Sequence, residues 1–258
     1  MNKIVPIPAF ADNYIWAIHS LNDSQVAVVD PGDAEPVLQY LQKSQLSLNA
    51  ILITHRHWDH TNGITQLLEH FPNVPVYGPN RSVYQITNII EDGMFVTLEA
   101  QELKLSVMAI PGHTLDHIAY AGEGILFCGD TLFSAGCGRI FEGTPQQMYD
   151  SLNKLASLDD DTLIYCGHEY TLNNLAFALS LEPDNKLLRT KALEIAALRV
   201  ANKASLPSRL RDEKTFNPFL KCHLLEFQNQ ITLLTGKELS SPVDFFTEVR
   251  SMKDHFKA

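Results

Sequence analysis

Four side chains that can bind a metal ion, His55, His57, Asp59 and His60, lie within one stretch of six residues. Imidazole nitrogens and carboxylate oxygens suit zinc, iron and related ions, and a carboxylate can bridge two of them. A single histidine is more often a packed or surface residue, but four such side chains at this spacing have no simple structural use. The stretch therefore predicts a metal site.

Three further metal-capable side chains directly follow apolar, strand-like runs. His113 follows VMAIPG, Asp130 follows ILFCG and His168 follows LIYCG. A glycine stands immediately before each of them, and glycine tolerates positive φ and close backbone approach. If these strand ends converge, all seven side chains form one centre.

The composition of this set points to catalysis. Structural zinc sites favour cysteine thiolates and fill all four coordination positions, whereas none of the four cysteines belongs to the set. Seven side chains shared by two ions leave positions for water and substrate. Two ions roughly 3.5–4 Å apart can hold a hydroxide between them at neutral pH. We therefore predict two divalent cations per chain, with zinc preferred and iron or manganese as alternatives, and a hydrolytic reaction at an acyl or phosphoryl bond.

The elements that must position these residues alternate along the first two thirds of the chain. Thr144, Pro145 and Gln147 have the pattern of a capping box with proline at the first helical position. Helices are also expected at 61–70, 174–181, 185–203 and 222–234, with a loop around Pro207 and Pro218. We predict a layered α/β domain over 1–171 and a helical domain over 172–258. Strands are expected at 25–30, 50–54, 102–110, 117–121, 124–128 and 162–166.

The charges are unevenly distributed between these two parts. Residues 1–171 hold 7 Lys and Arg against 20 Asp and Glu (−13), and residues 172–258 hold 13 against 10 (+3), which gives the net charge of −10. The acidic total argues against a nucleic-acid partner, since binding to phosphates needs a basic face. The basic excess of the last part fits either a solvated helical surface or a cationic wall for an anionic substrate.

The sequence also bears on the cell compartment. No apolar run approaches the roughly 18 residues that a membrane-spanning helix needs, and no secretory apolar region follows the first residues. We expect a cytoplasmic protein that does not bind membranes. Cysteines in that compartment are predicted to be thiols rather than disulfides.

The Thr54–His60 run T-H-x-H-x-D-H, with the later PGH, CGD and CGH turns, resembles the metallo-β-lactamase superfamily. More narrowly, GDTLFSAGCGRIFEG (129–143) and CGHEYTLNNLAFA (166–178) resemble the glyoxalase II, or hydroxyacylglutathione hydrolase, family over essentially the whole chain. The resemblance implies an αββα sandwich followed by a helical domain. It also implies hydrolysis of S-D-lactoylglutathione to D-lactate and glutathione by a metal-bridged hydroxide, a step of methylglyoxal detoxification.

The resemblance further implies roles for individual residues. Asp59 and Asp130 are the carboxylates expected to take part in catalysis, with Asp130 bridging the two ions. The first ion is expected on His55, His57 and His113, and the second on Asp59, His60 and His168.

Six residues match the family's glutathione contacts. Arg139 stands where lysine is common; it keeps the charge and can bind a carboxylate through two parallel hydrogen bonds. Phe141 stands where tyrosine is common and lacks the hydroxyl. The spacing of Arg250 and Lys253 puts both cations on one helical face. The six residues are Arg139, Phe141, Tyr170, Asn173, Arg250 and Lys253.

Several alternatives stay open. A lactonase, a β-lactamase or a persulfide-oxidising relative would keep the fold and change the chemistry; the last uses one iron, so seven ligands argue against it. A metal-binding or interaction module without catalysis belongs to another class. Asp116 and His117 could orient a metal ligand or have a structural role. The expected partner is a small-molecule thioester, and the expected state is a monomer.

Overall fold

The computed structural model describes residues 2–20, 24–79 and 83–257. The chain forms two compact units. The first comprises Met1–Ala109, Asp116–Gly129 and Tyr165–His168, and the second comprises Ile110–Leu115, Asp130–Ile164 and Glu169–Ala258. Because the units interleave along the chain, they do not test the domain boundary between residues 171 and 172, which stays a prediction.

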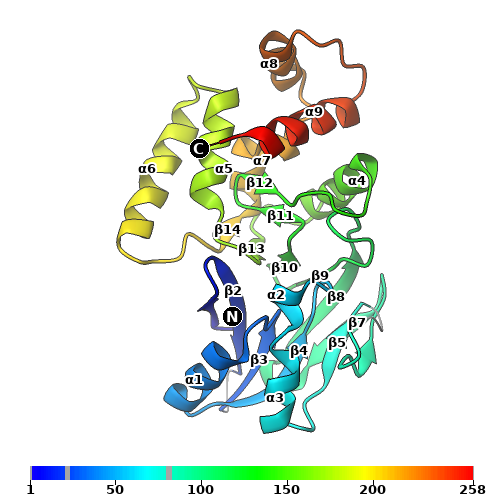
Figure 1. Cartoon of the computed structure of the whole chain (residues 1–258), viewed down its shortest axis with the longest axis vertical. Coiled ribbons are helices and arrows are strands. Elements are labelled where there is room, and N and C mark those ends of the chain that lie inside the picture. Colours follow the sequence, from blue (N-terminus) through cyan, green and yellow to red (C-terminus); the bar gives the residue numbers. More distant parts are fainter. Residues whose placement is uncertain (1, 21–23, 80–82, 258) are drawn as a thin grey trace. The chain divides into compact units, whose positions relative to one another are not determined.

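One six-stranded sheet lies in the first unit, with its strands in chain order (Figure 1). β1, β2 and β3 pair antiparallel, and β3 to β6 pair parallel. Parallel neighbours need a crossover, which α1 (Ala34–Ser44) supplies between β3 and β4, and α3 (Ile64–His70) between β4 and β5. Val37 of α1 and Leu67 of α3 are fully buried in one core with Val28 and Ile51 of the sheet. The strands are β1 (Ile4–Ala9), β2 (Asn13–His19), β3 (Gln25–Val29), β4 (Ser47–Leu52), β5 (Val76–Gly78) and β6 (Asn88–Ile89).

A second six-stranded sheet has the order β14-β13-β10-β9-β8-β7. Within the first unit, buried aromatic side chains tie it to the first sheet. Tyr120 Oη donates to the Ile53 carbonyl at 2.8 Å, and Trp16 Nε1 donates to the Cys166 carbonyl at 2.9 Å. The first unit is therefore two layers of sheet with α1 and α3 on one face. The strands are β7 (Phe95–Leu98), β8 (Leu103–Ala109), β9 (Ile118–Gly122), β10 (Ile125–Gly129), β13 (Leu163–Cys166) and β14 (Ser208–Arg209).

The predicted α/β class and the predicted strands are confirmed, but the helix expected at 61–70 is not continuous. It consists of α2 (Trp58–Thr61) and α3, separated by Asn62 and Gly63. Gly63 packs against the turn after β3, where its N–H donates to the Pro31 carbonyl at 3.0 Å. A Cβ at Gly63 would lie 2.5 Å from that carbonyl oxygen. The close approach leaves no room for a side chain at this position.

Helices dominate the second unit. The capping box predicted at Thr144 is present, with both reciprocal hydrogen bonds to Gln147. The loop expected around Pro207 and Pro218 is wrong, since α7 and a short 3-10 turn (Pro218–Leu220) occupy it. Glu213, a polar residue, occupies a buried position of α7 where an apolar residue would be expected. The apolar periodicity that would identify this helix in the sequence is therefore interrupted. The helices are α4 (Pro145–Ala156), α5 (Thr171–Leu181), α6 (Lys186–Val200), α7 (Leu210–Phe216), α8 (Leu225–Thr235) and α9 (Pro242–His255).

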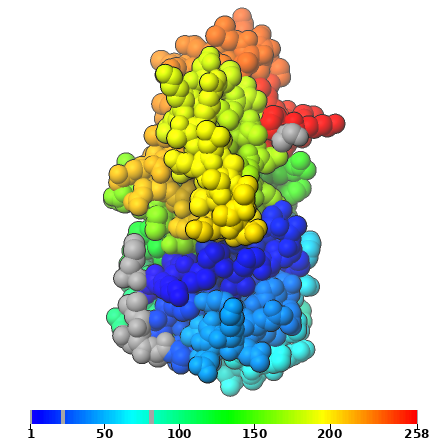
Figure 2. Space-filling model, turned by 90° about the vertical axis from the view of Figure 1, so that its left-hand side faces the viewer, coloured from blue at the N-terminus to red at the C-terminus, as the bar shows by residue number. Residues whose placement is uncertain are grey.

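The surface of α6 is visible in yellow-green and yellow in Figure 2. Leu188 and Ile195 of this helix are buried, whereas Leu193 and Val200 are exposed.

Nowhere in the described ranges is a helix long and apolar enough to span a membrane. The cysteines are buried thiols, and no disulfide is found among them in the described part of the chain.

Candidate metal centre

The first unit holds five of the seven predicted metal ligands. The loop after β4 carries two of them, α2 carries two, and the fifth follows β13. An isolated bridge between Asn13 and His168 ties the start of β2 to that last turn, and Tyr14 N–H donates to the Gly167 carbonyl at 2.8 Å. Local pairing of distant segments thus positions the group, which consists of His55, His57, Asp59, His60 and His168.

Three of these residues form a metal-capable group. One ligand atom from each of Asp59, His60 and His168 lies within 4.8 Å of the others. Asp59 Oδ2 is 3.5 Å from His60 Nε2 and 3.4 Å from His168 Nε2, and Asn13 Nδ2 holds the same oxygen at 3.0 Å. Two imidazole nitrogens and a carboxylate oxygen are a donor set that zinc, iron and manganese accept. The residues present therefore fit a divalent cation.

Two further carboxylates orient these imidazole rings. Asp30 Oδ2 lies 3.0 Å from His60 Nδ1, and Asp12 Oδ1 lies 2.8 Å from His168 Nδ1. Metal-binding histidines commonly donate the N–H of the second ring nitrogen to a carboxylate, which fixes the tautomer and the ring orientation. In both rings Nε2 is left to face Asp59. Asp30 is itself held by the backbone N–H of Thr54 at 2.8 Å.

The two orienting carboxylates were not among the predicted site residues. Asp30 ends a buried strand directly before Pro31 and is itself buried, and an acid at the end of an apolar run is a signal that could have pointed to it. Asp12 carries no such signal, because its partner lies 156 residues away in the chain. Only the folded chain reveals that pairing.

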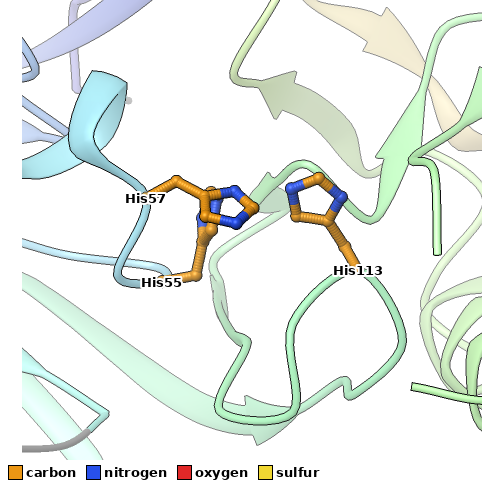
Figure 3. Close-up of side chains that lie close together, drawn as sticks. All are labelled: His55, His57 and His113. Atoms are coloured by element: carbon orange, nitrogen blue, oxygen red, sulfur yellow. The ribbon is translucent and has the colours of Figure 1, made fainter. Parts of the chain in front are cut away.

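His55 and His57 form a second pair on the loop after β4. Their Nε2 and Nδ1 atoms lie 3.1 Å apart. The His117 ring stacks on the His55 ring, with centroids 4.5 Å apart and planes 12° apart. His117 therefore lies beside a predicted ligand. Asp116 instead forms an ion pair with Arg56, at 3.4 Å. Figure 3 shows the rings of His55 and His57, from the loop after β4, and of His113, from the loop after β8.

Gly129 shows why one of the glycines before a predicted ligand is required. Its φ is +46°, a left-handed conformation that other residues rarely adopt. A Cβ there would lie 2.3 Å from Thr54 Oγ1 and 2.9 Å from the His117 ring. The turn after β10 can therefore approach the loop after β4 only without a side chain.

His113 and Asp130, the remaining two predicted ligands, belong to the second unit. His113 Nε2 lies 3.5 Å from Asp130 Oδ2. His113 Nδ1 lies 2.8 Å from the Arg139 carbonyl, which can accept a hydrogen bond from the Nδ1 N–H and so leave Nε2 as the atom available to a cation. This pair again consists of donors that a divalent cation accepts.

The second unit also brings together most of the predicted substrate residues. Arg139 Nε and Arg250 Nη2 both donate to Asp254 Oδ1, at 3.3 and 3.1 Å. Lys253 Nζ donates to both the carbonyl and the side-chain oxygen of Asn173. Arg250 is buried and also donates from Nη1 to the Cys137 carbonyl at 2.8 Å. Three cations thus meet on the face of α9.

The two aromatic substrate candidates are more exposed. Phe141 is 60% exposed and its ring contacts His113 edge to face, with centroids 5.2 Å apart. Tyr170 is 36% exposed and contacts Phe133 in the same way at 5.2 Å. Exposed aromatic rings beside a polar centre can form the apolar part of a ligand site.

Burial changes the titration of one of the cations. Desolvation, followed by repulsion from Arg250, lowers the pKa of Lys253 to about 8. Asp254 and Cys137 act in the opposite direction. Lys253 therefore loses its charge within a pH range that is easily measured.

Comparisons with known proteins join these observations. The model of the metallo-beta-lactamase superfamily matches residues 11–168, and that of the hydroxyacylglutathione hydrolase C-terminus matches residues 169–256. The chain is 50% identical to the hydroxyacylglutathione hydrolase of Aeromonas salmonicida over 99% of this chain and 100% of that protein. It is 49% identical to the enzyme of the same name from Vibrio campbellii, with the same coverage.

This chain belongs to the hydroxyacylglutathione hydrolase family. The crystal structure of ETHE1 from Myxococcus xanthus is 24% identical to this chain, with a TM-score of 0.64 and with 98% of both chains covered. That similarity shows the fold, and with the family matches it confirms the αββα metallo-β-lactamase sandwich with a helical C-terminal domain. In this hydroxyacylglutathione hydrolase family member, the carboxylates and histidines of the candidate centre lie in the region that matches the metallo-beta-lactamase superfamily. Helix α9 lies in the region that matches the hydroxyacylglutathione hydrolase C-terminus.

Proposed function

We propose that this chain hydrolyses S-D-lactoylglutathione, and other S-2-hydroxyacylglutathiones, to the 2-hydroxy acid and glutathione, and so serves in methylglyoxal detoxification. The observation that carries the proposal is the 50% identity to a hydroxyacylglutathione hydrolase along the full length of both chains. That identity spans both the ligand-bearing turns and the cationic helix α9.

The proposed cofactor is a pair of divalent cations, with zinc preferred over iron or manganese. The oriented group of Asp59, His60 and His168 supports one of the two sites. Bound cations would lower the pKa of a water molecule and polarise the thioester carbonyl. We assign the other site to His55, His57 and His113, with Asp130 shared between the two.

The chain's own side chains would bind and orient the glutathione part of the substrate. Arg139, Arg250 and Lys253 are assigned to its carboxylates, because guanidinium and ammonium groups pair with carboxylates. Phe141 and Tyr170 would cover its apolar surface, and Asn173 would hold Lys253 in place. A fixed set of donors lowers the entropy lost when the substrate is positioned.

Metal removal tests the proposal. Elemental analysis of the purified protein should find about two divalent ions per chain, and a chelator should abolish turnover of S-D-lactoylglutathione until metal is returned. Unchanged turnover in the apoprotein would contradict the proposal. Turnover of lactones or β-lactams instead, or about one iron per chain, would favour the alternative chemistries, and absence of any metal-dependent turnover would favour a non-catalytic module.

The cytoplasmic location and the monomeric state stay predictions. Sedimentation at several protein concentrations would test the second of them.

A further inference from the structure

A short buried hairpin connects two residues of the proposed site. β11 (Leu132–Phe133) and β12 (Gly136–Cys137) pair antiparallel, and Asp130 and Arg139 flank them. We call residues 130–139 the hairpin segment. Its turn is buried, and Ala135 within it has a left-handed φ of +55°. A two-stranded hairpin this short is not stable alone, so other parts of the chain must hold it.

Three polar side chains from later in the sequence hold the hairpin by its backbone. Glu213 Oε2 accepts from Ala135 N–H at 2.8 Å. Asn217 Nδ2 donates to the Phe133 carbonyl at 3.1 Å and to the Gly136 carbonyl at 3.0 Å. Asn174 Nδ2 donates to the Ser134 carbonyl at 3.1 Å. Asn217 also donates to Glu213 Oε2 at 3.2 Å, so these two side chains act together; we call Asn174, Glu213 and Asn217 the polar clamp.

The clamp consists of groups that are costly to bury. Glu213 and Asn217 are both fully buried, and burial raises the pKa of the Glu213 carboxyl. A buried polar group lowers stability unless its hydrogen bonds are satisfied. An apolar side chain would suit the neighbouring core, which contains Ala135 and Phe216. The hydrogen bonds to the hairpin are therefore the specific contribution of these residues.

The two ends of the hairpin segment are packed against each other. Gly138 N–H donates to the Thr131 carbonyl at 3.1 Å, and a Cβ on Gly138 would lie 1.8 Å from the Asp130 carbonyl oxygen. The Arg139 carbonyl in turn lies 2.8 Å from His113 Nδ1. A displacement of the hairpin would therefore move Asp130 and Arg139 together and would disturb His113.

We propose that Glu213, supported by Asn217 and Asn174, is a positioning residue that fixes the hairpin segment and thereby sets both a metal ligand and a substrate-binding cation. The inference rests on the proposed function for the roles of Asp130 and Arg139. It links two properties that otherwise vary independently, metal retention and KM.

Substitution of Glu213 tests the link. Glu213→Ala should weaken metal retention against a competing chelator by about tenfold or more, the usual effect of losing a group that orients a ligand, and should raise KM in parallel. Glu213→Gln should stay close to the wild type in both, because its amide oxygen can still accept from Ala135 N–H and Asn217. The control is Glu182→Ala, which removes the ion pair with Lys221 in the same unit; in the described part of the chain no hydrogen bond is found between the Glu182 side chain and the hairpin.

A second pair of variants keeps the test sharp if Glu213→Ala does not fold. A Cβ at Gly136 would lie 2.4 Å from Asn174 Nδ2, so Gly136→Ala should push the hairpin away from α5, weaken metal retention and raise KM. Asn174→Ala in the same chain makes room for the new methyl group but also removes the clamp's hydrogen bond to the Ser134 carbonyl, so the double variant should recover only part of both losses. The free energy of unfolding of each variant, measured in parallel, separates a loss of position from a general loss of stability.

The outcomes separate the two proposals. A folded Glu213→Ala protein with wild-type metal retention and KM, or a folded Gly136→Ala protein with both unchanged, would overturn the positioning role. If the wild type does not hydrolyse S-D-lactoylglutathione, the proposed function fails, whereas the metal-retention measurements still decide the role of the clamp.

Discussion

At the scale of single residues, the metal-capable group depends on acids that are not themselves predicted ligands. Asp12 and Asp30 each face the Nδ1 atom of one histidine, so that Nε2 is directed at Asp59. This arrangement fixes the tautomer of His60 and His168 before any ion binds, which removes a cost that a flexible histidine would impose on binding.

Asp12→Asn should therefore weaken metal binding without abolishing it. The amide can still occupy the position but lacks the charge that favours the correct tautomer, and losses of about 10- to 100-fold in metal affinity are typical for such partners. Competition with a chromophoric chelator measures this affinity directly. The exposed Asp184, which lies on a loop of the second unit, gives the control variant Asp184→Asn; equal affinities in the two variants would contradict the orienting role.

The lowered pKa of Lys253 predicts how activity depends on pH. In the proposed function its charged form binds a substrate carboxylate, and that form is present below its folded-state pKa of about 8 and lost as the pH rises above it. The groups that influence it are Arg250, Asp254 and Cys137, together with its hydrogen-bond partner Asn173. At pH 9 only about a tenth of the free protein would carry the charge, so kcat/KM should fall between pH 7 and pH 9.

The pH profile of kcat/KM, which reports the free enzyme, tests this expectation. In Lys253→Arg the fall near pH 8 should disappear, since arginine stays charged throughout this range. A fall of the same size and position in that variant would assign the titration to another group.

At the scale of elements, helix α9 carries two cations, Arg250 and Lys253, whose environments differ. Arg250 is buried and bonded at both ends of its guanidinium fork, to Cys137 and Asp254, whereas Lys253 is partly exposed. Arg250→Ala should raise KM by about 30-fold or more, because truncating a buried, hydrogen-bonded charge commonly costs 2–5 kcal/mol. Arg250→Lys should recover only part of the loss, because lysine lacks the planar fork.

Lys237 provides a matched control for α9. It forms an exposed ion pair with Glu248 on the same helix, and Lys237→Ala should leave KM unchanged. A similar rise of KM in both variants would show that α9 as a whole, rather than the Arg250 side chain, had been disturbed.

The elements also show how far the sequence could predict the structure. The strands that precede His113, Asp130 and His168 are found where their apolar runs predict them, since a buried strand shows its pattern within a few residues. The clamp could not be predicted, because Glu213 accepts from a backbone N–H and Asn174 donates to a backbone carbonyl, and every residue type except proline offers both groups. Asp12 was missed for a related reason, since its partner is distant in the chain.

At the scale of the whole molecule, the net charge of −10 would repel an anionic substrate, whereas the cations on and near α9 would attract it. The distance over which charges act decides whether repulsion or attraction prevails, because screening reduces the influence of charges beyond about 8 Å at physiological ionic strength. The local cations should therefore dominate, and raising the salt from about 0.05 M to about 0.5 M should raise KM. A fall of KM over this range would mean that repulsion by the acidic part dominates.

The pairing of Asp12 with His168 has a consequence for biosynthesis. When the strands of the first sheet have been synthesised, the chain already contains Asp12, Asp30, Asp59 and His60. His168 can meet its orienting partner Asp12 only after residue 168 has emerged from the ribosome and β13 has paired. A nascent chain can therefore offer only an incomplete set of donors, and tight capture of the ion has to follow folding of the first unit rather than guide its early steps.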